Sequence, residues 1–257
     1  MARQEKLHRD TTIDPETVAH FDRLGAQWWD LDGPMRALHK FNPVRVAYLR
    51  ELLCKHFPFD GNPRDWRKAQ ALQGLTILDI GCGAGILSEP LARLGASVTA
   101  IDPARRNIEV AREHAAKTRL SIDYRCASAE AIAAEGVVFD VVLAMEVVEH
   151  VRDVGRFLGS AAAMVRPGGM LAAATLNRTL KSFALAILGA EYLLRWLPRG
   201  THDWSRFVTP QELAKALRAA GLRIKDETGV VYDPLGAKWR LSHDMDINYI
   251  MAAIRPL

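Results

Sequence analysis

Short apolar runs alternate with longer amphipathic stretches through the middle of the chain. The runs are rich in branched residues and have the length of strands, which predicts five strands, at 75–80, 97–101, 121–125, 138–144 and 170–175. Most are separated by stretches whose apolar residues recur every three or four positions, which predicts helices at 86–94, 104–117 and 153–165. This alternation favours an α/β fold, a doubly wound parallel sheet with helices on both faces.

Helices are also predicted ahead of the sheet. Residues 11–30 carry apolar side chains at helical spacing after Asp14-Pro15-Glu16, a sequence typical of a helix start. A second helix is expected to begin at Asn42-Pro43, with the proline in its first turn, and to run to about residue 56. Proline and glycine residues then mark 58–73 as a loop before the first strand.

Beyond the fifth strand the alternation changes. Thr209-Pro210-Gln211-Glu212 predicts the start of another helix, and 222–227 and 247–254 are expected to close the sheet as an antiparallel pair of strands. Residues 181–206 form an insertion whose apolar run, Phe183 to Leu188, lies among basic residues: Lys181, Arg195, Arg199 and Arg206. Such a segment fits either a buried lid helix or a surface lying in an anionic membrane interface.

The most informative motif follows the first predicted strand. The apolar run Ile77-Leu78-Asp79-Ile80 ends in the cluster Gly81-Cys82-Gly83-Ala84-Gly85, and the next strand ends at Asp102. Gly81, Gly83 and Gly85 lack a Cβ, so the backbone of this turn can approach a ligand closely. Asp102 would lie at the end of a parallel strand, where its two oxygens can accept hydrogen bonds from the hydroxyls of a ribose. The pattern therefore predicts a nucleotide-binding β-α-β unit.

Two details of this motif separate classes of nucleotide. The spacing is G-x-G-x-G and position 86 is Ile, whereas a dinucleotide loop needs Gly or Ala three residues beyond its second Gly. Asp79 would place a negative charge beside the turn, where it would repel a diphosphate and attract a cationic amino group or a sulfonium. Hydride transfer is therefore disfavoured, and residues 77–85 resemble the S-adenosylmethionine loop of class I methyltransferases.

Side chains that can move protons or bind a metal follow the fourth predicted strand. If residues 145–150 are helical, Glu146, Glu149 and His150 lie at i, i+3 and i+4 and share one face over the ligand edge of the sheet. Two carboxylates and an imidazole can ligate a divalent metal. Alternatively, His150 takes a proton from a hydroxyl while a glutamate orients it. Asn177, just past the fifth strand, is a further candidate for contact with the substrate.

Composition narrows the class of protein. The chain has 257 residues, 49% of them hydrophobic, which suits one catalytic domain with added segments. It has no apolar stretch of the ~20 residues that cross a bilayer, no hydrophobic signal core and no metal-like cysteine spacing, so a cytoplasmic protein is expected. The net charge of +4 would suit an anionic partner, but nucleic acid is not predicted, because zinc-finger spacing, RNA-binding aromatic patterns and basic blocks are absent.

Together these features resemble the ubiquinone biosynthesis O-methyltransferases, which methylate polyprenyl-catechol and demethylubiquinol intermediates. The resemblance covers almost the whole chain, and general methyltransferases share only the glycine loop and an Arg-Pro-Gly-Gly turn. The segments that carry it include Ala26-Gln27-Trp28-Trp29-Asp30, Leu38 to Arg45, Met145 to Val151, Thr175 to Arg178, Gly189 to Tyr192, Gly200-Thr201-His202-Asp203 and Asp246 to Tyr249. One departure is Ala84, where many relatives carry a further glycine.

The resemblance implies roles for single residues. It implies contacts to S-adenosyl-L-methionine from Arg45, Gly81, Asp102 and Met145. It also implies that a magnesium-like ion is held by Glu146, Glu149 and His150. Such an ion would lower the pKa of the phenolic hydroxyl that attacks the methyl group; otherwise His150 itself is the base, and the sequence leaves both mechanisms open. The alternative activity is methyl transfer to another small acceptor.

The resemblance also sets expectations for organisation and partners. We expect one methyltransferase domain made of four parts. These are an N-terminal helical segment (1–73), a cofactor-binding core (74–180), the insertion (181–206) and a part that completes the sheet (207–257). The substrate would be a polyprenylated phenol or quinol that partitions into the bilayer, which gives the insertion a reason to contact an anionic membrane surface. The protein would then lie on the inner face of the cytoplasmic membrane, where it could meet other enzymes of ubiquinone biosynthesis.

Overall fold

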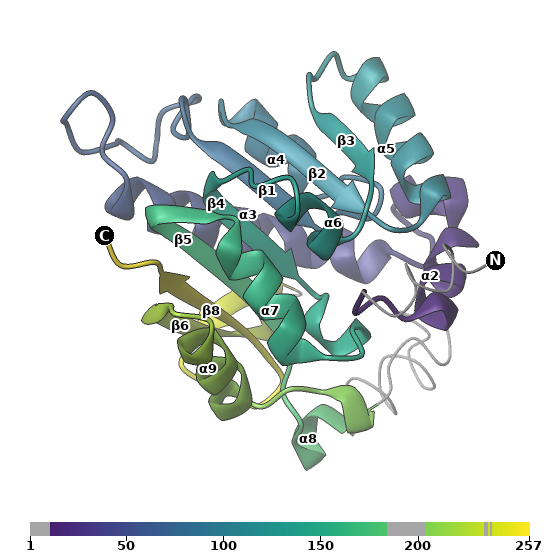
Figure 1. Ribbon diagram of the computed structural model, residues 1–257. Coiled ribbons are helices and arrows are strands. Elements are labelled where there is room, and N and C mark those ends of the chain that lie inside the picture. The colour runs from purple at the N-terminus through teal and green to yellow at the C-terminus, as the bar shows by residue number, and fades with distance from the viewer. Residues whose placement is uncertain (1–10, 184–203, 234–235, 237) are drawn as a thin grey trace.

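The computed structural model describes residues 11–183, 204–233, 236 and 238–257, and these contain one eight-stranded mixed sheet (Figure 1). Five parallel strands follow the order β3-β2-β1-β4-β5, and antiparallel pairing continues the sheet as β8-β6-β7. The predicted doubly wound α/β sheet is confirmed. The strands are β1 (Thr76–Ile80), β2 (Ser97–Asp102), β3 (Asp123–Cys126), β4 (Phe139–Met145), β5 (Val165–Leu176), β6 (Arg223–Asp233), β7 (Lys238–Ser242) and β8 (Asn248–Ile254).

Two sets of helices cover the sheet, because successive side chains of each strand point to opposite faces. One set packs on the face that carries Ile77 and Ala172: α3 (Arg36–His56), α4 (Ser88–Arg93) and α5 (Arg105–Lys117). The other packs on the face that carries Leu78 and Leu171: α6 (Ala129–Ala133), α7 (Val154–Ala163) and α9 (Pro210–Ala219). Figure 1 shows α7 and α9 on the near face, with α3 and α4 behind the sheet.

The N-terminal part departs from the single helix predicted over 11–30. Helix α2 (Pro15–Asp22) begins where expected, since Asp14 Oδ1 accepts a hydrogen bond from the backbone amide two residues on at 3.2 Å. The chain then breaks at Gly25, whose φ of 49° lies in the left-handed region, and continues as the 3-10 helix η1 (Gly25–Trp29). Of the apolar residues at helical spacing, Leu24 and Trp28 are buried, but the spacing did not predict this break.

Helix α3 carries the N-terminal segment onto the sheet. It begins earlier than the predicted start at Asn42, so Pro43 lies inside the helix rather than in its first turn. Asn42 is buried, and its Nδ2 donates to the carbonyl oxygen of Ile86 at 2.8 Å, just beyond the glycine loop. Arg45 lies three residues further along, on the same side of α3. The contact therefore holds this side of α3 against the ligand edge of the sheet.

The predicted antiparallel pair is confirmed, although β6 extends well beyond 227. β8 pairs with both β5 and β6 and so lies between them. The end of β6 pairs with β7, a strand that the sequence pattern did not predict. The short helix α6 was also missed, because its five residues are too few to show a period. α9 begins as predicted, with reciprocal hydrogen bonds between Thr209 and Glu212.

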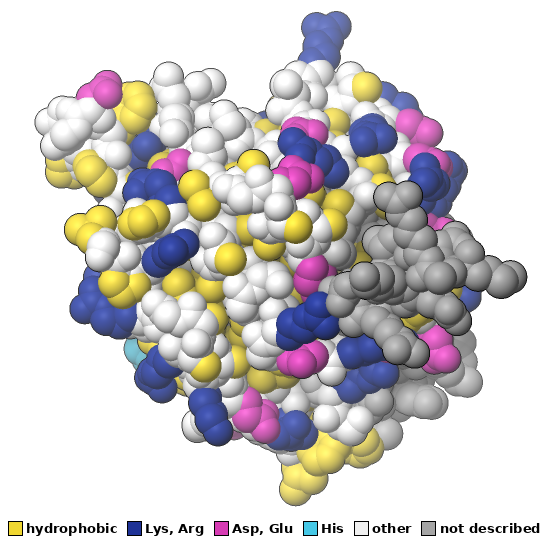
Figure 2. Space-filling view, viewed as in Figure 1, with side chains coloured by type: hydrophobic (Ala, Val, Ile, Leu, Met, Phe, Trp, Pro, Cys, Tyr) yellow, Lys and Arg dark blue, Asp and Glu magenta, His cyan; other side chains and the backbone are white. Residues whose placement is uncertain are grey.

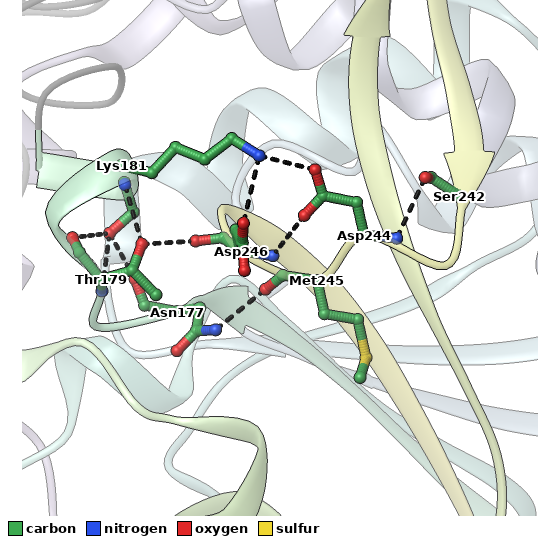
Figure 3. Close-up of polar contacts among 8 residues, drawn as sticks. Asn177, Thr179, Lys181, Ser242, Asp244, Met245 and Asp246 are labelled. Atoms are coloured by element: carbon green, nitrogen blue, oxygen red, sulfur yellow. Dashed lines mark hydrogen bonds and ion pairs between the residues drawn. The ribbon is translucent and has the colours of Figure 1, made fainter.

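Polar contacts join the start of the insertion to the loop before β8 (Figure 3). Helix α8 (Leu180–Ser182) carries Lys181, whose Nζ lies 2.6 Å from Asp244 Oδ2 and 3.2 Å from Asp246 Oδ2. Thr179 Oγ1 donates to the carbonyl oxygen of Asp246 at 2.7 Å. The beginning of the insertion is thus attached to the sheet edge that borders the ligand site.

Residues 184–203, which include Arg195, Arg199 and most of the predicted apolar run, lie outside the described residues. The chain is described again from the 3-10 helix η4 (Trp204–Arg206), where Arg206 Nη1 pairs with Asp14 Oδ2 at 2.6 Å. Lys181 and Arg206, two of the basic residues expected to face a membrane, therefore pair with carboxylates of the chain itself. Across the described residues, no helix is both long enough and apolar enough to cross a membrane.

Candidate active site

A cavity of about 990 Å³ opens at the carboxyl ends of the parallel strands. Gly81 follows β1, Asp102 ends β2 and Met145 ends β4, so parallel pairing brings all three to one edge, where ligands bind in open α/β sheets. The structure brings nearly all of the predicted site residues to the lining of this cavity: Arg45, Asp79, Gly81, Asp102, Met145, Glu146, Glu149 and His150. Of the predicted catalytic and cofactor-binding residues, Gly83 does not line it.

Asp102 organises one side of the cavity. Its Oδ1 accepts hydrogen bonds from the Ala104 amide at 2.8 Å and from Asn107 Nδ2 at 3.2 Å, and its Oδ2 accepts one from the Gly83 amide at 2.9 Å. Burial raises the pKa of this carboxyl to about 6, despite these donors. A carboxylate has about four lone-pair sites, so Asp102 retains capacity to accept a further donor from a ligand.

Asp79 lies on β1 beside Asp102 and carries the second buried carboxyl group. Burial raises its pKa to about 6, and the neighbouring Asp102 charge acts in the same direction. Ser88 Oγ donates to Asp79 Oδ2 at 2.6 Å, and the positive charge of Arg45 opposes the shift. Near neutral pH both carboxyls are therefore mostly ionised, and the cavity edge between β1 and β2 is negative. This negative charge is the one that the sequence placed beside the turn, where it would attract a cationic group of a ligand.

The three glycines of the loop lie against different side chains. A Cβ on Gly81 would lie 2.5 Å from Val147 Cγ2, and Gly81 borders the cavity. A Cβ on Gly83 would instead lie 2.6 Å from the indole of Trp28, and one on Gly85 would lie 2.1 Å from the Tyr124 hydroxyl. The expectation that Gly83 and Gly85 clear space for a ligand is therefore corrected: Gly83 clears space for a tryptophan and Gly85 for a tyrosine.

The adjacent tryptophans, Trp28 and Trp29, both contact the glycine loop. Trp28 Nε1 donates to Asn107 Oδ1 at 2.8 Å, which links the N-terminal segment to the hydrogen bonds of Asp102. Trp29 Nε1 donates to the Ala84 carbonyl oxygen at 3.1 Å, and its ring stacks on His114 with centroids 3.5 Å apart. Asn107 was missed in the sequence because its role depends on this long-range contact.

Arg45 is almost wholly buried at the other end of the negative edge. Its Nη2 lies 3.4 Å from Glu146 Oε1, and its guanidinium lies over the Phe41 ring at 4.6 Å from the centroid. Burial lowers the pKa of Arg45, while the charges of Glu146, Asp79 and Glu149 oppose that shift. The guanidinium therefore neutralises several carboxylates at once, rather than forming one tight pair.

Glu146, Glu149 and His150 all line the cavity, but they do not share a helix. Glu146 has a φ of 59°, in the left-handed region, and the only helical turn here is the 3-10 helix η2 (Val148–His150). Glu149 is buried, and its Oε2 accepts a hydrogen bond from Thr175 Oγ1 at 2.7 Å. In the part of the chain that the structure describes, no three His, Cys, Asp or Glu side chains are grouped to hold a metal ion. The predicted helical face is wrong, and in this arrangement the three do not form a metal centre.

The other half of the cavity is aromatic and apolar. Phe41 of α3 meets Trp239 of β7 edge to face, with ring centroids 5.2 Å apart, and Tyr232 of β6 lies 5.4 Å from Trp239. Val230 lies on the same side of the cavity. Val230 and Tyr232 were missed because the strand containing them was predicted to end at residue 227, and Trp239 was missed because β7 was not predicted. The alternation of Val230 and Tyr232 is the signal that could have revealed the longer β6.

Asn177, the further candidate for contact with substrate, does not line the cavity. It is buried, and its Nδ2 donates to the Met245 carbonyl oxygen at 2.9 Å (Figure 3). Its own amide donates to the carbonyl oxygen of Ile247 at 2.7 Å. Asn177 therefore joins the end of β5 to the loop before β8, and its role in this structure is structural.

Comparison with known proteins agrees with this geometry. The family model described as "Methyltransferase domain" matches residues 36–227. A solved magnesium protoporphyrin IX methyltransferase from Synechocystis, with bound SAH, superposes with a TM-score of 0.59 at 21% identity, covering 86% of this chain and 85% of that one. A possible histamine N-methyltransferase from Thermotoga maritima superposes with a TM-score of 0.59 at 18% identity, covering 93% and 99%. At these identities the structures show the fold alone.

The family assignment rests on relatives that match over almost their full length. The ubiquinone biosynthesis O-methyltransferase of Methylocella silvestris is 64% identical over 253 residues, 98% of each chain. The protein of the same name from Methylobacterium nodulans is 58% identical over 246 residues, 96% of this chain and 97% of that one. With the fold, the glycine loop and the methyltransferase domain in agreement, this chain belongs to the ubiquinone biosynthesis O-methyltransferases, a family of S-adenosylmethionine-dependent enzymes.

Proposed function

We propose that the cavity binds S-adenosylmethionine along the edge from β2 to β4. The single observation that carries this is the run of buried charges Asp102, Asp79 and Arg45 beside the backbone of Gly81. Asp102 accepts hydrogen bonds from the ribose hydroxyls, and the negative Asp79 side attracts the amino group of the methionine part. Met145, at the end of β4, contacts the donor from the other side.

The acceptor is a polyprenyl catechol or demethylubiquinol, bound in the aromatic half of the cavity. Phe41, Tyr232 and Trp239 supply faces and edges on which a phenolic ring can pack. His150 takes the proton of the phenolic hydroxyl as the oxygen attacks the methyl carbon in line. The bond between that carbon and sulfur breaks, and the sulfur keeps the electron pair in S-adenosylhomocysteine.

Magnesium stays a prediction from the family resemblance. Bound to Glu146, Glu149 and His150, a divalent cation would lower the pKa of the attacking hydroxyl. Glu149 and Thr175 are already hydrogen bonded to each other, and Glu146 already pairs with Arg45. Because the side chains as they stand do not fit a metal centre, no step above depends on the ion.

Activity is tested with S-adenosylmethionine and a short-chain prenyl catechol, with magnesium or with EDTA. We expect O-methylated product by mass spectrometry, and slower turnover of catechol without the prenyl group, because that acceptor leaves apolar cavity surface uncovered. Product from neither acceptor, with S-adenosylhomocysteine still bound by calorimetry, would point to a different acceptor. Loss of turnover in EDTA and its recovery with magnesium would support the metal-dependent mechanism.

We further propose peripheral attachment to an anionic membrane, where a tailed substrate and other enzymes of its pathway would be met. Leu180 and Phe183, at the described start of the insertion, are 82% and 39% exposed. Figure 2 shows hydrophobic side chains gathered at the lower end of the molecule, where Figure 1 places α8. Exposed apolar side chains of this kind can enter a bilayer interface.

Attachment is tested by co-sedimentation with phosphatidylglycerol liposomes at low and at high salt. We expect binding at low salt that weakens at high salt, since lipid charge attracts basic residues. Replacing Leu180 and Phe183 with serine should reduce binding at an almost unchanged melting temperature. A protein that stays in the supernatant at low salt would contradict the proposal, and a lowered melting temperature would assign the two side chains to the folded core.

A further inference from the structure

Arg45 is a buried cation whose hydrogen bonding is incomplete. Its side chain is 4% exposed, and among the described residues its single ion pair is the 3.4 Å contact to Glu146, longer than the usual 2.7–2.9 Å of a charge-assisted hydrogen bond. Its Nε is buried and has no hydrogen-bond partner in the described part of the chain. A buried guanidinium is stable only when its donors meet negative or polar acceptors. Arg45 therefore has capacity for a second anion, and it lines the cavity.

The position of Arg45 indicates which anion this is. The ends of the strands run in the order β2, β1, β4, and the charged side chains beside them follow as Asp102, Asp79 and then Arg45 with Glu146. A donor whose ribose lies at Asp102 extends its methionine part past Asp79 toward Arg45. The amino group of that part is attracted by Asp79, and its carboxylate is then within reach of the guanidinium. A planar carboxylate is the anion that a guanidinium binds best.

We propose that Arg45 exchanges partners when the donor binds: the methionine carboxylate takes the place of Glu146, and Glu146 moves toward the acceptor. This rests on S-adenosylmethionine being the donor. Glu146 has a left-handed φ of 59°, a backbone conformation that residues other than glycine adopt at a cost and that clusters at functional sites. Its backbone amide stays anchored to the carbonyl oxygen of Ala174 at 2.9 Å, so the side chain can move while the main chain is held. The exchange makes Arg45 and Glu146 positioning residues that couple the two halves of the cavity, with the donor binding first.

Calorimetry in EDTA tests the exchange without turnover. The parent and Glu146→Gln are titrated with S-adenosylhomocysteine and with decarboxylated S-adenosylhomocysteine, which keeps the amine but lacks the carboxylate. In Glu146→Gln, Arg45 no longer pairs with a charged competitor, so S-adenosylhomocysteine should bind about fivefold tighter or more. The decarboxylated ligand should bind no tighter. Asp244→Asn is the matched control, since Asp244 lines the cavity but pairs with Lys181, and it should leave the ratio of the two affinities unchanged.

A second variant tests the other partner. Arg45→Gln should bring the two affinities close together, because the residue that recognises the carboxylate is gone; if this variant does not fold, Glu146→Gln decides alone. An unchanged ratio of affinities in Glu146→Gln would overturn the exchange. A parent that binds both ligands equally would show that Arg45 does not meet the carboxylate. A parent that binds neither ligand would instead overturn the proposed donor, which is a separate outcome.

Discussion

Replacing His150 with alanine is expected to lower turnover by about 10²- to 10⁴-fold, the usual contribution of a general base. His150 lines the cavity from η2, and its ring meets the edge of Phe21 with centroids 5.2 Å apart, which holds it in place. The affinity for S-adenosylhomocysteine should change little, because the proton transfer occurs at the acceptor. Single-turnover rates and calorimetry on the same preparation measure the two effects.

The control for this variant is His243→Ala, since His243 is exposed and does not line the cavity. Its turnover should match that of the parent. If EDTA leaves the parent rate untouched while His150→Ala removes it, the general-base role stands and the metal role is wrong. A His150→Ala enzyme that keeps its full rate would contradict both roles.

Replacing Asp102 with alanine is expected to weaken the binding of S-adenosylhomocysteine by about 1 to 3 kcal/mol, a loss of roughly five- to 150-fold. Two causes act together. The ribose hydroxyls lose their acceptor, and the amides of Gly83 and Ala104 lose theirs inside the protein. The melting temperature should therefore fall as well, even without ligand.

The control for Asp102→Ala is Asp123→Ala. It removes a carboxylate of the same charge from the neighbouring strand β3, where Asp123 is exposed and pairs with Arg125. It should leave the affinity unchanged. Unchanged affinity in Asp102→Ala would rule out the ribose contact, and tight binding of NAD by the parent would contradict the donor itself.

The parallel part of the sheet could be predicted because apolar residues recur with a different period in its strands than in the helices between them. Each strand is an apolar run bounded by turn residues, and parallel pairing then places Gly81, Asp102 and Met145 at one edge without further information. The break at Gly25 and the strand β7 could not be predicted, because each depends on what the segment packs against.

The chemistry of the edge was harder to predict than its position. The residue types at 146, 149 and 150 were found, but their geometry was not, since a helix was assumed where Glu146 adopts a left-handed conformation. The role of Gly83 was misjudged for a related reason. A glycine in the sequence indicates that another group packs closely against its Cα. Only the fold shows that at Gly83 this group is Trp28 rather than a ligand.

The place of β8 in the sheet has a consequence for the order of folding. β8 is made after β6 and β7, yet it lies between β5 and β6 and pairs with both. During synthesis, the outer edge of β5 therefore emerges long before its partner does. An apolar strand with an open edge readily pairs with other chains, so the nascent protein passes through a stage prone to aggregation. A substitution that slows the docking of β8 should therefore lower the yield of folded protein more than its effect on equilibrium stability would suggest.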